Sequence, residues 1–253
     1  MRNAGLPLPD RESKPRSNGL SVIIDNGAPL NLFIDTIRSS GEFIDFVKFG
    51  WGTSLVTPFL EEKIACLREN NIDFFFGGTL FEKFLSVGKI EHFYDLCCEF
   101  DCNHVEISNG TVAITNSEKA RFISEFSREF TVFSEVGNKD AVYSDSQLSS
   151  EWVDHIHEDI SAGAEKVITE ARESGTAGIC REDGALRTDI FEEILESGIP
   201  LERLIFEAPT KKMQSFFIKY GGPDVNLANI ALSEVIALET LRLGLRSDTF
   251  HLF

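Results

Sequence analysis

The feature that most restricts the fold of this 253-residue chain is a regular alternation of short apolar runs with longer amphipathic segments. Between the runs lie segments with helical spacing of apolar residues, such as TPFLEEKIACLREN and SSEWVDHIHEDISA. Strands that alternate with helices form parallel sheets, so we expect an α/β fold. Eight strand candidates favour a single (β/α)8 (TIM) barrel; they span residues 20–24, 45–49, 72–77, 104–108, 131–135, 165–171, 202–208 and 225–230.

A doubly wound parallel sheet is the alternative architecture. It is disfavoured because the chain has neither the G-x-G-x-x-G fingerprint nor a P-loop. The first residues, MRNAGLPLPDRESKPRSNG, mix charge with proline and glycine and lack the apolar segment of a secretory signal. We therefore expect a leader or arm over residues 1–18 and one barrel domain over residues 19–253.

The charge balance limits the partners of the chain. There are 41 acidic and 24 basic residues, which gives a net charge of −17. Nucleic acids and anionic membranes both need a basic face, so neither is an expected partner. The apolar runs are also much shorter than a membrane span, so we expect a cytoplasmic protein without a membrane segment. A locally positive pocket for small anions remains compatible with an acidic chain.

Charged residues interrupt five of the apolar runs, each near its carboxyl end. Side chains alternate between the two faces of a strand, and the apolar neighbours suit the helix side, so most of these charges turn into the barrel. A single one would be a solvated rim residue or a simple ion pair. Five at equivalent places indicate a functional mouth, because barrel enzymes assemble their sites at this end; they are Lys48, Glu106, Glu135, Glu170 and Glu207.

Several carboxylates at one mouth repel each other unless they are protonated, paired with cations or bridged by a divalent metal ion. The cations that the sequence offers nearby are Lys48, Lys139, Arg172 and Lys211. The polar segment GGPDVNLANI near the end of the chain is a candidate phosphate cradle, because loops after strands 7 and 8 of such barrels often bind phosphate.

Seven motifs, in order from about Asp25 to Phe250, resemble the phosphosulfolactate synthase family. They are VKFGWGTS, GGTLFE, VEISNGT, SEVGNKD, AGAEKVITEARESG, FEAPTKKMQ, and GPDVNLANI followed by LETLRLGLRSDTF. The resemblance implies a (β/α)8 barrel that uses Mg²⁺ to add sulfite to phosphoenolpyruvate, giving (2R)-phospho-3-sulfolactate. In methanogens this reaction opens coenzyme M biosynthesis, and a plant branch of the family is associated with heat stress.

The resemblance also implies roles for single residues. Lys139 matches the lysine of the family motif EVG-x-K, which is the proposed acid that protonates an enediolate intermediate. Asn138 stands where some members carry a second lysine. By their positions at the strand ends, Glu135 and Glu170 are the first candidates for Mg²⁺ binding, with Glu106 or Glu207 as alternates. A glutamate here would equally suit the tuning of Lys139 by pairing with it.

The remaining assignments concern substrate binding. We expect Arg172 to clamp an anionic group in the reaction, because its planar guanidinium matches carboxylate, phosphate and sulfonate oxygens. The other expected substrate-binding residues are Lys48, Glu106, Lys211, Gln214 and Asn226. Two other functions stay open: a related barrel enzyme acting on another phosphorylated small acid, and a stress-associated homologue without catalysis. The resemblance further implies a homo-oligomer, with a trimer as one form.

Overall fold

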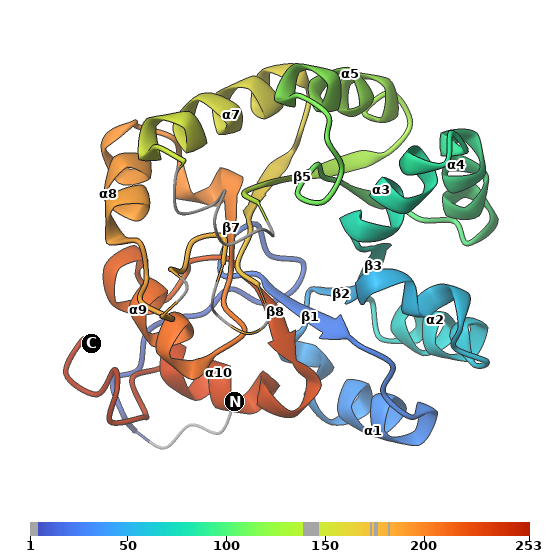
Figure 1. The fold of residues 1–253 in the computed structure, drawn as a ribbon. Coiled ribbons are helices and arrows are strands. Elements are labelled where there is room, and N and C mark those ends of the chain that lie inside the picture. The colour runs from blue at the N-terminus through green and yellow to red at the C-terminus, as the bar shows by residue number, and fades with distance from the viewer. Residues whose placement is uncertain (1–4, 139–146, 173, 175–176, 182) are drawn as a thin grey trace.

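The computed structural model describes residues 5–138, 147–172, 174, 177–181 and 183–253, and these form a barrel of parallel strands surrounded by helices (Figure 1). The prediction of an α/β fold and a single (β/α)8 barrel is confirmed. Each expected apolar run overlaps one strand, with bounds that agree within two residues. The strands are β1 (Ser21–Asp25), β2 (Phe46–Phe49), β3 (Asp73–Phe76), β4 (His104–Ile107), β5 (Thr131–Val136), β6 (Lys166–Thr169), β7 (Leu204–Glu207) and β8 (Leu227–Ala231).

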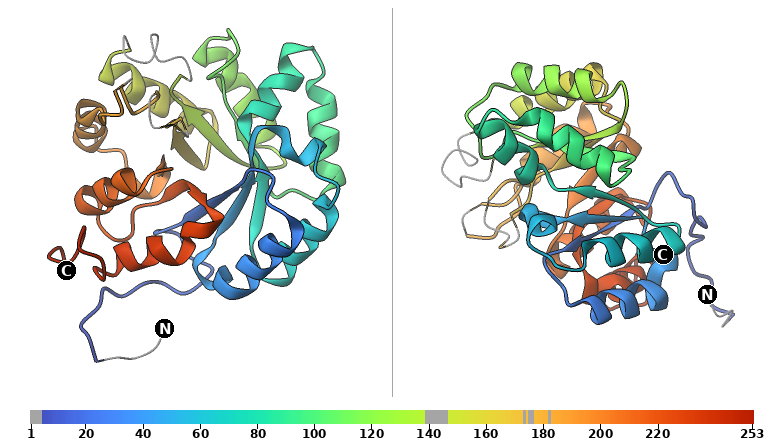
Figure 2. Two further views of the ribbon diagram at one scale, coloured as in Figure 1. Left: turned by 60° about the horizontal axis from the view of Figure 1, so that its bottom comes forward. Right: turned by 90° about the vertical axis from the view of Figure 1, so that its right-hand side faces the viewer.

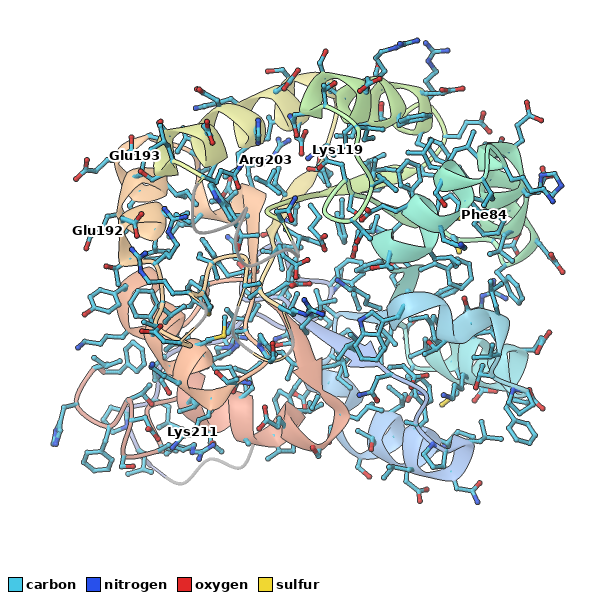
Figure 3. All side chains as sticks on the ribbon, in the orientation of Figure 1. Phe84, Lys119, Glu192, Glu193, Arg203 and Lys211 are labelled. Carbon is cyan, nitrogen blue, oxygen red and sulfur yellow. The ribbon has the colours of Figure 1, made fainter. Side chains whose placement is uncertain are left out.

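The helices cover the outside of the barrel and turn their charged faces to solvent, as Glu192 and Glu193 on α8 show (Figure 3). They are α1 (Leu30–Ser40), α2 (Leu60–Glu69), α3 (Gly78–Ser86), α4 (Ile90–Glu99), α5 (Asn116–Phe126), α7 (Ser149–Ala162), α8 (Thr188–Glu196), α9 (Lys211–Gly221) and α10 (Val235–Arg242). Short 3₁₀ helices are η1 (Gly41–Phe43), η2 (Gly50–Leu55), η3 (Leu201–Arg203) and η4 (Leu232–Glu234).

The strands follow the order β3-β2-β1-β8-β7-β6-β5-β4, so β3 and β4 meet where the sheet closes on itself. No ladder of backbone hydrogen bonds joins these two strands within the described residues. Side chains cross the seam instead: the Glu106 carboxylate accepts a hydrogen bond from the Gly78 N–H at 2.6 Å, and Asn103 donates to Asp73 at 3.4 Å.

Two hydrophobic layers hold the barrel together. The larger one lies between strands and helices and contains fully buried rings such as Phe33, Trp152 and Phe217. The smaller one fills the barrel interior, where Phe133 packs edge-on against Phe46 and Phe75 at centroid distances of 5.3 and 5.5 Å. Because side chains alternate along a strand, residues two positions beyond this inner layer also face the interior, and there the charged residues begin.

The opposite end of the barrel is covered by the described part of the segment that precedes β1 (Figure 2). Arg11 pairs with Asp224 at 2.6 Å and with Glu239 at 3.1 Å. Arg16 pairs with Asp45 at 3.1 Å. The expected leader of residues 1–18 is therefore anchored to the barrel through its described part rather than loose.

Buried Arg242 completes this end of the barrel. Its guanidinium donates to the carbonyl oxygens of Pro223, Val225 and Leu20 at 2.6, 2.7 and 3.1 Å. Burial lowers the pKa of Arg242 to about 9. These contacts close the end of the barrel at which the strands begin, and the candidate site lies at the other end.

Candidate active site

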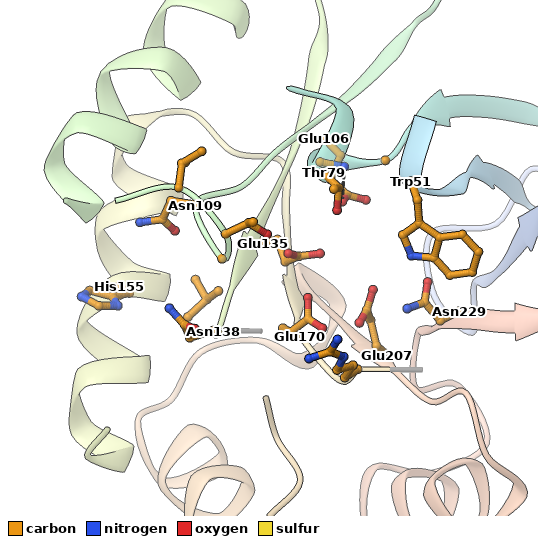
Figure 4. Close-up of a pocket in the computed structure, with 18 of the residues that line it drawn as sticks. Trp51, Thr79, Glu106, Asn109, Glu135, Asn138, His155, Glu170, Glu207 and Asn229 are labelled. Atoms are coloured by element: carbon orange, nitrogen blue, oxygen red, sulfur yellow. Dashed lines mark hydrogen bonds between the residues drawn. The ribbon is translucent and has the colours of Figure 1, made fainter. Parts of the chain in front are cut away.

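A cavity of about 1330 Å³ opens at the carboxyl ends of the strands (Figure 4). It is lined by Lys48 from β2 and Glu207 from β7, which are not neighbouring strands, together with Glu106, Glu135 and Glu170. All five charged residues that the sequence placed at the mouth line this cavity. They occupy the layer directly above the apolar interior, so strand alternation is what brings them together.

Lys48 lies at the centre of the carboxylates. Its Nζ atom is 2.8 Å from Glu207, 3.1 Å from Glu106 and 3.8 Å from Glu135. The sequence suggested that Lys48 binds a substrate anion directly, whereas the structure gives its ammonium group three carboxylate partners. Its immediate effect is therefore to hold several acidic groups in a small volume.

The crowding changes proton affinities in this cluster. Burial, aided by the carboxylates of Glu135 and Glu207, raises the pKa of Glu106 to about 7, against the opposing effects of Lys48 and the Gly78 N–H. Burial and the Glu135 carboxylate likewise raise the pKa of Glu207. Burial alone would lower the pKa of Lys48, but the three surrounding carboxylates outweigh it and raise that pKa. The lysine is therefore charged and the cluster favours additional positive charge.

Three carboxylates of the cluster also form a candidate metal centre. One oxygen from each of Glu135, Glu170 and Glu207 lies within 4.8 Å of the others, and all three residues are buried. Oxygen-only ligand sets of this kind suit Mg²⁺ and other hard divalent cations. Four acidic residues line the described pocket against two fixed cations, Lys48 and Arg172, so the charge balance also fits a bound cation.

Backbone groups hold these carboxylates in place. Glu207 accepts a hydrogen bond from the Ala171 N–H at 2.8 Å, which ties the end of β7 to the segment after β6. Glu106 accepts from Gly78, where a Cβ atom would come within 2.3 Å of the Ser108 hydroxyl and 2.8 Å of the Glu106 carboxylate. Only glycine allows the backbone to approach so closely.

A buried ion pair supports Glu135 from the helix side. The Lys119 ammonium donates to the carbonyl oxygen of Glu135 at 2.8 Å and pairs with Asp159 at 2.7 Å (Figure 3). Lys119 and Asp159 are completely buried. Sequence reasoning missed this pair because both residues lie on amphipathic helices, where charged residues are usually solvated.

Two further site residues were expected from the sequence, Arg172 and Lys139. Arg172 lines the pocket, as predicted for an anion clamp, and so does Asn138. Lys139, the expected general acid, lies outside the described residues. Its role therefore stays a prediction from the family motif.

The structure does not bring Lys211, Gln214 and Asn226 into the lining of this pocket. Lys211 is about half exposed at the start of α9 and pairs with Asp248 at 3.1 Å (Figure 3). Gln214 is buried and donates to the carbonyl of Ala208 and to Glu234. Each of these two side chains is thus engaged in local contacts around α9.

Asn226 needs the largest correction, because it lies at the opposite end of the barrel. Its amide donates to the Leu204 carbonyl at 2.8 Å, and its oxygen accepts from the Leu20 N–H at 3.0 Å. Both partners are at the beginnings of strands. The expected phosphate cradle fails for the same reason, since residues 221–226 precede β8 instead of following it.

Other lining residues were not anticipated, namely Trp51, Thr79, Asn109, His155 and Asn229 (Figure 4). Burial lowers the pKa of His155. The one available signal for Asn229 was that asparagine is depleted in strands. Among the helices of the described residues, none combines the length and apolar character needed to cross a membrane.

Comparison with known proteins gives a consistent picture. A family model described as (2R)-phospho-3-sulfolactate synthase (ComA) matches residues 9–248. The phosphosulfolactate synthase of Bacillus subtilis (strain 168) is 58% identical over 252 residues, covering 100% of both chains. The phosphosulfolactate synthase of Methanothermobacter thermautotrophicus is 40% identical, covering 95% of each chain.

More distant similarities extend these matches. Protein HEAT-STRESS-ASSOCIATED 32 of Arabidopsis thaliana is 24% identical, covering 92% of this chain and 88% of that protein. Among solved structures, a 3-hexulose-6-phosphate synthase superposes with a TM-score of 0.56 at 13% identity, covering 88% of this chain and 97% of that one. At such low identity the structural match supports the barrel fold alone.

Proposed function

The chain belongs to the (2R)-phospho-3-sulfolactate synthase (ComA) family, and we propose that it joins sulfite to phosphoenolpyruvate to form (2R)-phospho-3-sulfolactate. The observation that carries the proposal is the buried group of carboxylates around Lys48 at the mouth of the barrel. A reaction through an anionic intermediate needs positive charge where the negative charge develops. The carboxylates supply a place for a divalent cation, and Lys48 is a fixed positive charge among them.

The chemistry needs no activated nucleophile from the protein. The sulfur lone pair of sulfite forms a bond to the methylene carbon of phosphoenolpyruvate, and the electrons of the carbon–carbon double bond move into the carboxylate group. The resulting enediolate then takes one proton on the carbon that carries the phosphate. The protein must therefore orient two anions, stabilise the enediolate and deliver a proton to one face.

We assign Glu135, Glu170 and Glu207 as the residues that hold Mg²⁺, which would supply positive charge beside the substrate carboxylate when bound. The positive charge of Lys48 offsets the repulsion between the carboxylates of Glu106 and Glu207, so the two groups can lie close together without both being protonated. Arg172 contributes the second fixed cation and binds an anionic oxygen of substrate through its guanidinium. Sulfite then meets phosphoenolpyruvate in a pocket whose charges are fixed before the substrates arrive.

Lys139 is proposed as the acid that protonates the enediolate. Support comes from its match to the family motif and from the preceding residues: Val136, Gly137 and Asn138 all line the pocket. A cytoplasmic location and a homo-oligomeric assembly, with a trimer as one form, also stay proposals from the sequence.

The test is direct product detection. Purified protein is incubated with phosphoenolpyruvate, sulfite and Mg²⁺, and phosphosulfolactate is measured by mass spectrometry. We expect product from the wild type, a loss of at least a hundredfold in Lys139→Ala, and wild-type rates in Lys219→Ala, which alters an exposed lysine on α9. EDTA is expected to abolish turnover, and added Mg²⁺ to restore it.

Three outcomes separate the alternatives. Absence of product from folded wild type would overturn the proposed reaction, and a screen of other phosphorylated small acids would then distinguish a related enzyme from a non-catalytic homologue. Equal rates in wild type and Lys139→Ala would remove the lysine from the mechanism and leave the reaction standing. Full activity in EDTA would remove the metal assignment.

A further inference from the structure

Strand β8 contains a bulge next to the active site. In the pairing of β1 with β8, Ser21 lies opposite Leu227, but Ile23 lies opposite Ile230, so β8 has one more residue than β1 between these two pairs. Asn229 lies within the bulge and has a left-handed backbone with φ of 56°. A bulge of this kind redirects a side chain, and such irregularities are frequent beside active sites.

The conformation of Asn229 is not needed to turn the chain. Four non-glycine residues of the described chain have positive φ: Trp51, Asn71, Asp101 and Asn229. Asn71 and Asp101 occupy turns just after α2 and α4, where left-handed residues commonly end helices. Trp51 and Asn229 instead line the pocket, and they belong to segments that flank β1 on its two sides. Backbone strain at such positions persists where the site makes use of it.

The carboxamide of Asn229 has polar capacity that the protein leaves unused. Its Oδ1 atom is buried and has no hydrogen-bond partner in the described part of the chain. Buried polar atoms are nearly always paired, so this unpaired oxygen marks Asn229 as a side chain whose polar contacts the described residues do not complete. Ala228 pairs with Glu207 in the sheet, which places the next residue, Asn229, at the edge of the carboxylate cluster (Figure 4).

The chemistry of the proposed substrate identifies the ligand class. Phosphoenolpyruvate offers only acceptor oxygens in its carboxylate and phosphate groups, and the pocket around it is rich in carboxylates. The NH₂ group of the Asn229 carboxamide supplies two donors without adding charge. A neutral donor of this kind attracts an anionic oxygen without placing a further formal charge beside the carboxylates.

We infer that the bulge in β8 presents Asn229 as a positioning residue that donates a hydrogen bond to an anionic oxygen of phosphoenolpyruvate. The identity of the substrate in this inference rests on the proposed function. The assignment is to phosphoenolpyruvate instead of sulfite because Asn229 adjoins Glu207, on the side of the cluster assigned to the substrate carboxylate. The strained backbone is thus the means by which an otherwise regular strand contributes a side chain to binding.

Asn229→Gly tests the inference, because glycine retains the left-handed backbone and removes only the carboxamide. Its matched control is Asn71→Gly, which relieves a similar conformation with φ of 52° at an exposed turn. A third variant, Asn229→Asp, keeps the size of the side chain but replaces donors with a negative charge. We would measure kcat, the KM of each substrate, the affinity for phosphoenolpyruvate by calorimetry, and the melting temperature.

Asn229→Gly is expected to lower kcat/KM for phosphoenolpyruvate about 10- to 100-fold, the range for a hydrogen bond to a charged group. The KM for sulfite and the melting temperature should stay near wild type. Asn229→Asp should lose more activity than Asn229→Gly, an order that follows from charge repulsion and not from loss of folding. Asn71→Gly should match wild type in all kinetic constants.

Wild-type kcat/KM and wild-type affinity for phosphoenolpyruvate in Asn229→Gly would overturn the inference while the proposed reaction stands. Equal losses in Asn229→Gly and Asn71→Gly would overturn it too, since they would report a general effect on the fold. Absence of product from the wild type is the distinct failure of the proposed function. In that case calorimetry still decides: weaker binding of phosphoenolpyruvate by Asn229→Gly supports the inference, and unchanged or absent binding refutes it.

Discussion

Replacing Lys48 by methionine would test how the carboxylate cluster is held together. Methionine preserves the length and most of the volume of the side chain and removes only the charge. The three carboxylates now 2.8, 3.1 and 3.8 Å from the ammonium group would then lie together without a fixed cation among them. We expect this variant to be destabilised strongly at alkaline pH and much less at acidic pH.

The magnitude follows from burial. Removing one partner of a buried ion pair usually costs about 3–5 kcal/mol, because an uncompensated charge remains inside. For a domain of this size, that corresponds to a decrease of roughly 6–20 °C in melting temperature. The loss depends on pH, because protonation removes the charge. The pKa of Glu106 is already about 7 with Lys48 present and would rise further without it, so at pH 5.5 the buried carboxyl groups take up protons and the penalty shrinks.

The assay is thermal unfolding of the metal-free protein, followed by circular dichroism at pH 8 and pH 5.5. Lys63→Met is the matched control, because Lys63 is equally buried but pairs with a single carboxylate, that of Asp25. Asp25 also accepts hydrogen bonds from the Gly27 and Ala28 N–H groups, so two donors remain when the lysine is removed. Lys63→Met should therefore lose similar stability at both pH values. A pH-independent loss in Lys48→Met, or no loss at all, would refute the reasoning.

Three further predictions concern the site and the closed end of the barrel. The pKa of Glu106 is raised from 4.5 to about 7 in the folded protein. Without metal, the free energy of unfolding should therefore be highest at acidic pH and decrease by roughly 3 kcal/mol as pH rises through this interval. Denaturant titration at several pH values should show a weaker pH dependence for Glu106→Gln. Glu170→Gln should weaken Mg²⁺ binding at least tenfold in calorimetry because it removes a charged ligand, whereas an unchanged affinity would exclude Glu170 as a ligand. Arg242→Met should lower the free energy of unfolding by about 3 kcal/mol, because it removes three buried hydrogen bonds from a charged donor. Its kcat at 25 °C should stay within twofold of wild type, and a large loss of kcat in folded protein would contradict a purely structural role.

The barrel and the charged mouth were predictable because both depend on local rules. Strand alternation alone places Glu135 two residues above Phe133 and Glu207 two residues above Ile205, on the same inward face. Eight such runs leave few architectures, and the same pattern identifies which end carries the charges. The grouping of Glu135, Glu170 and Glu207 follows directly from these two facts.

The assignments that failed depend on whether a polar residue lies before a strand begins or near its carboxyl end. Asn226 and Asn229 are three residues apart in GGPDVNLANI, and only the second reaches the pocket. The first precedes β8 and pairs with the beginnings of neighbouring strands. The sequence does not reveal the bulge that directs Asn229 inward, because that bulge depends on the register between the first strand and the last.

Buried charges on helices escaped prediction for a related reason. Lys119 has the appearance of a solvated residue on an amphipathic helix, and its contact with the Glu135 carbonyl requires two helices and a strand to meet. Lys48 was recognised as part of the site, but its three carboxylate partners come from β4, β5 and β7, none of which is a neighbour of β2. Pairings of this range depend on how the sheet closes, which no local pattern encodes.

The seam between β3 and β4 gives that closure a particular consequence. Every other neighbouring pair of strands is joined by a ladder of backbone hydrogen bonds, whose spacing is fixed by the peptide unit. At the seam the spacing is set by side chains, and the contact nearest the pocket is that of Glu106 with Gly78. The circumference of the barrel can therefore adjust at this one place. A change in the width of the mouth, whether during turnover or across evolution to a larger substrate, would be concentrated there.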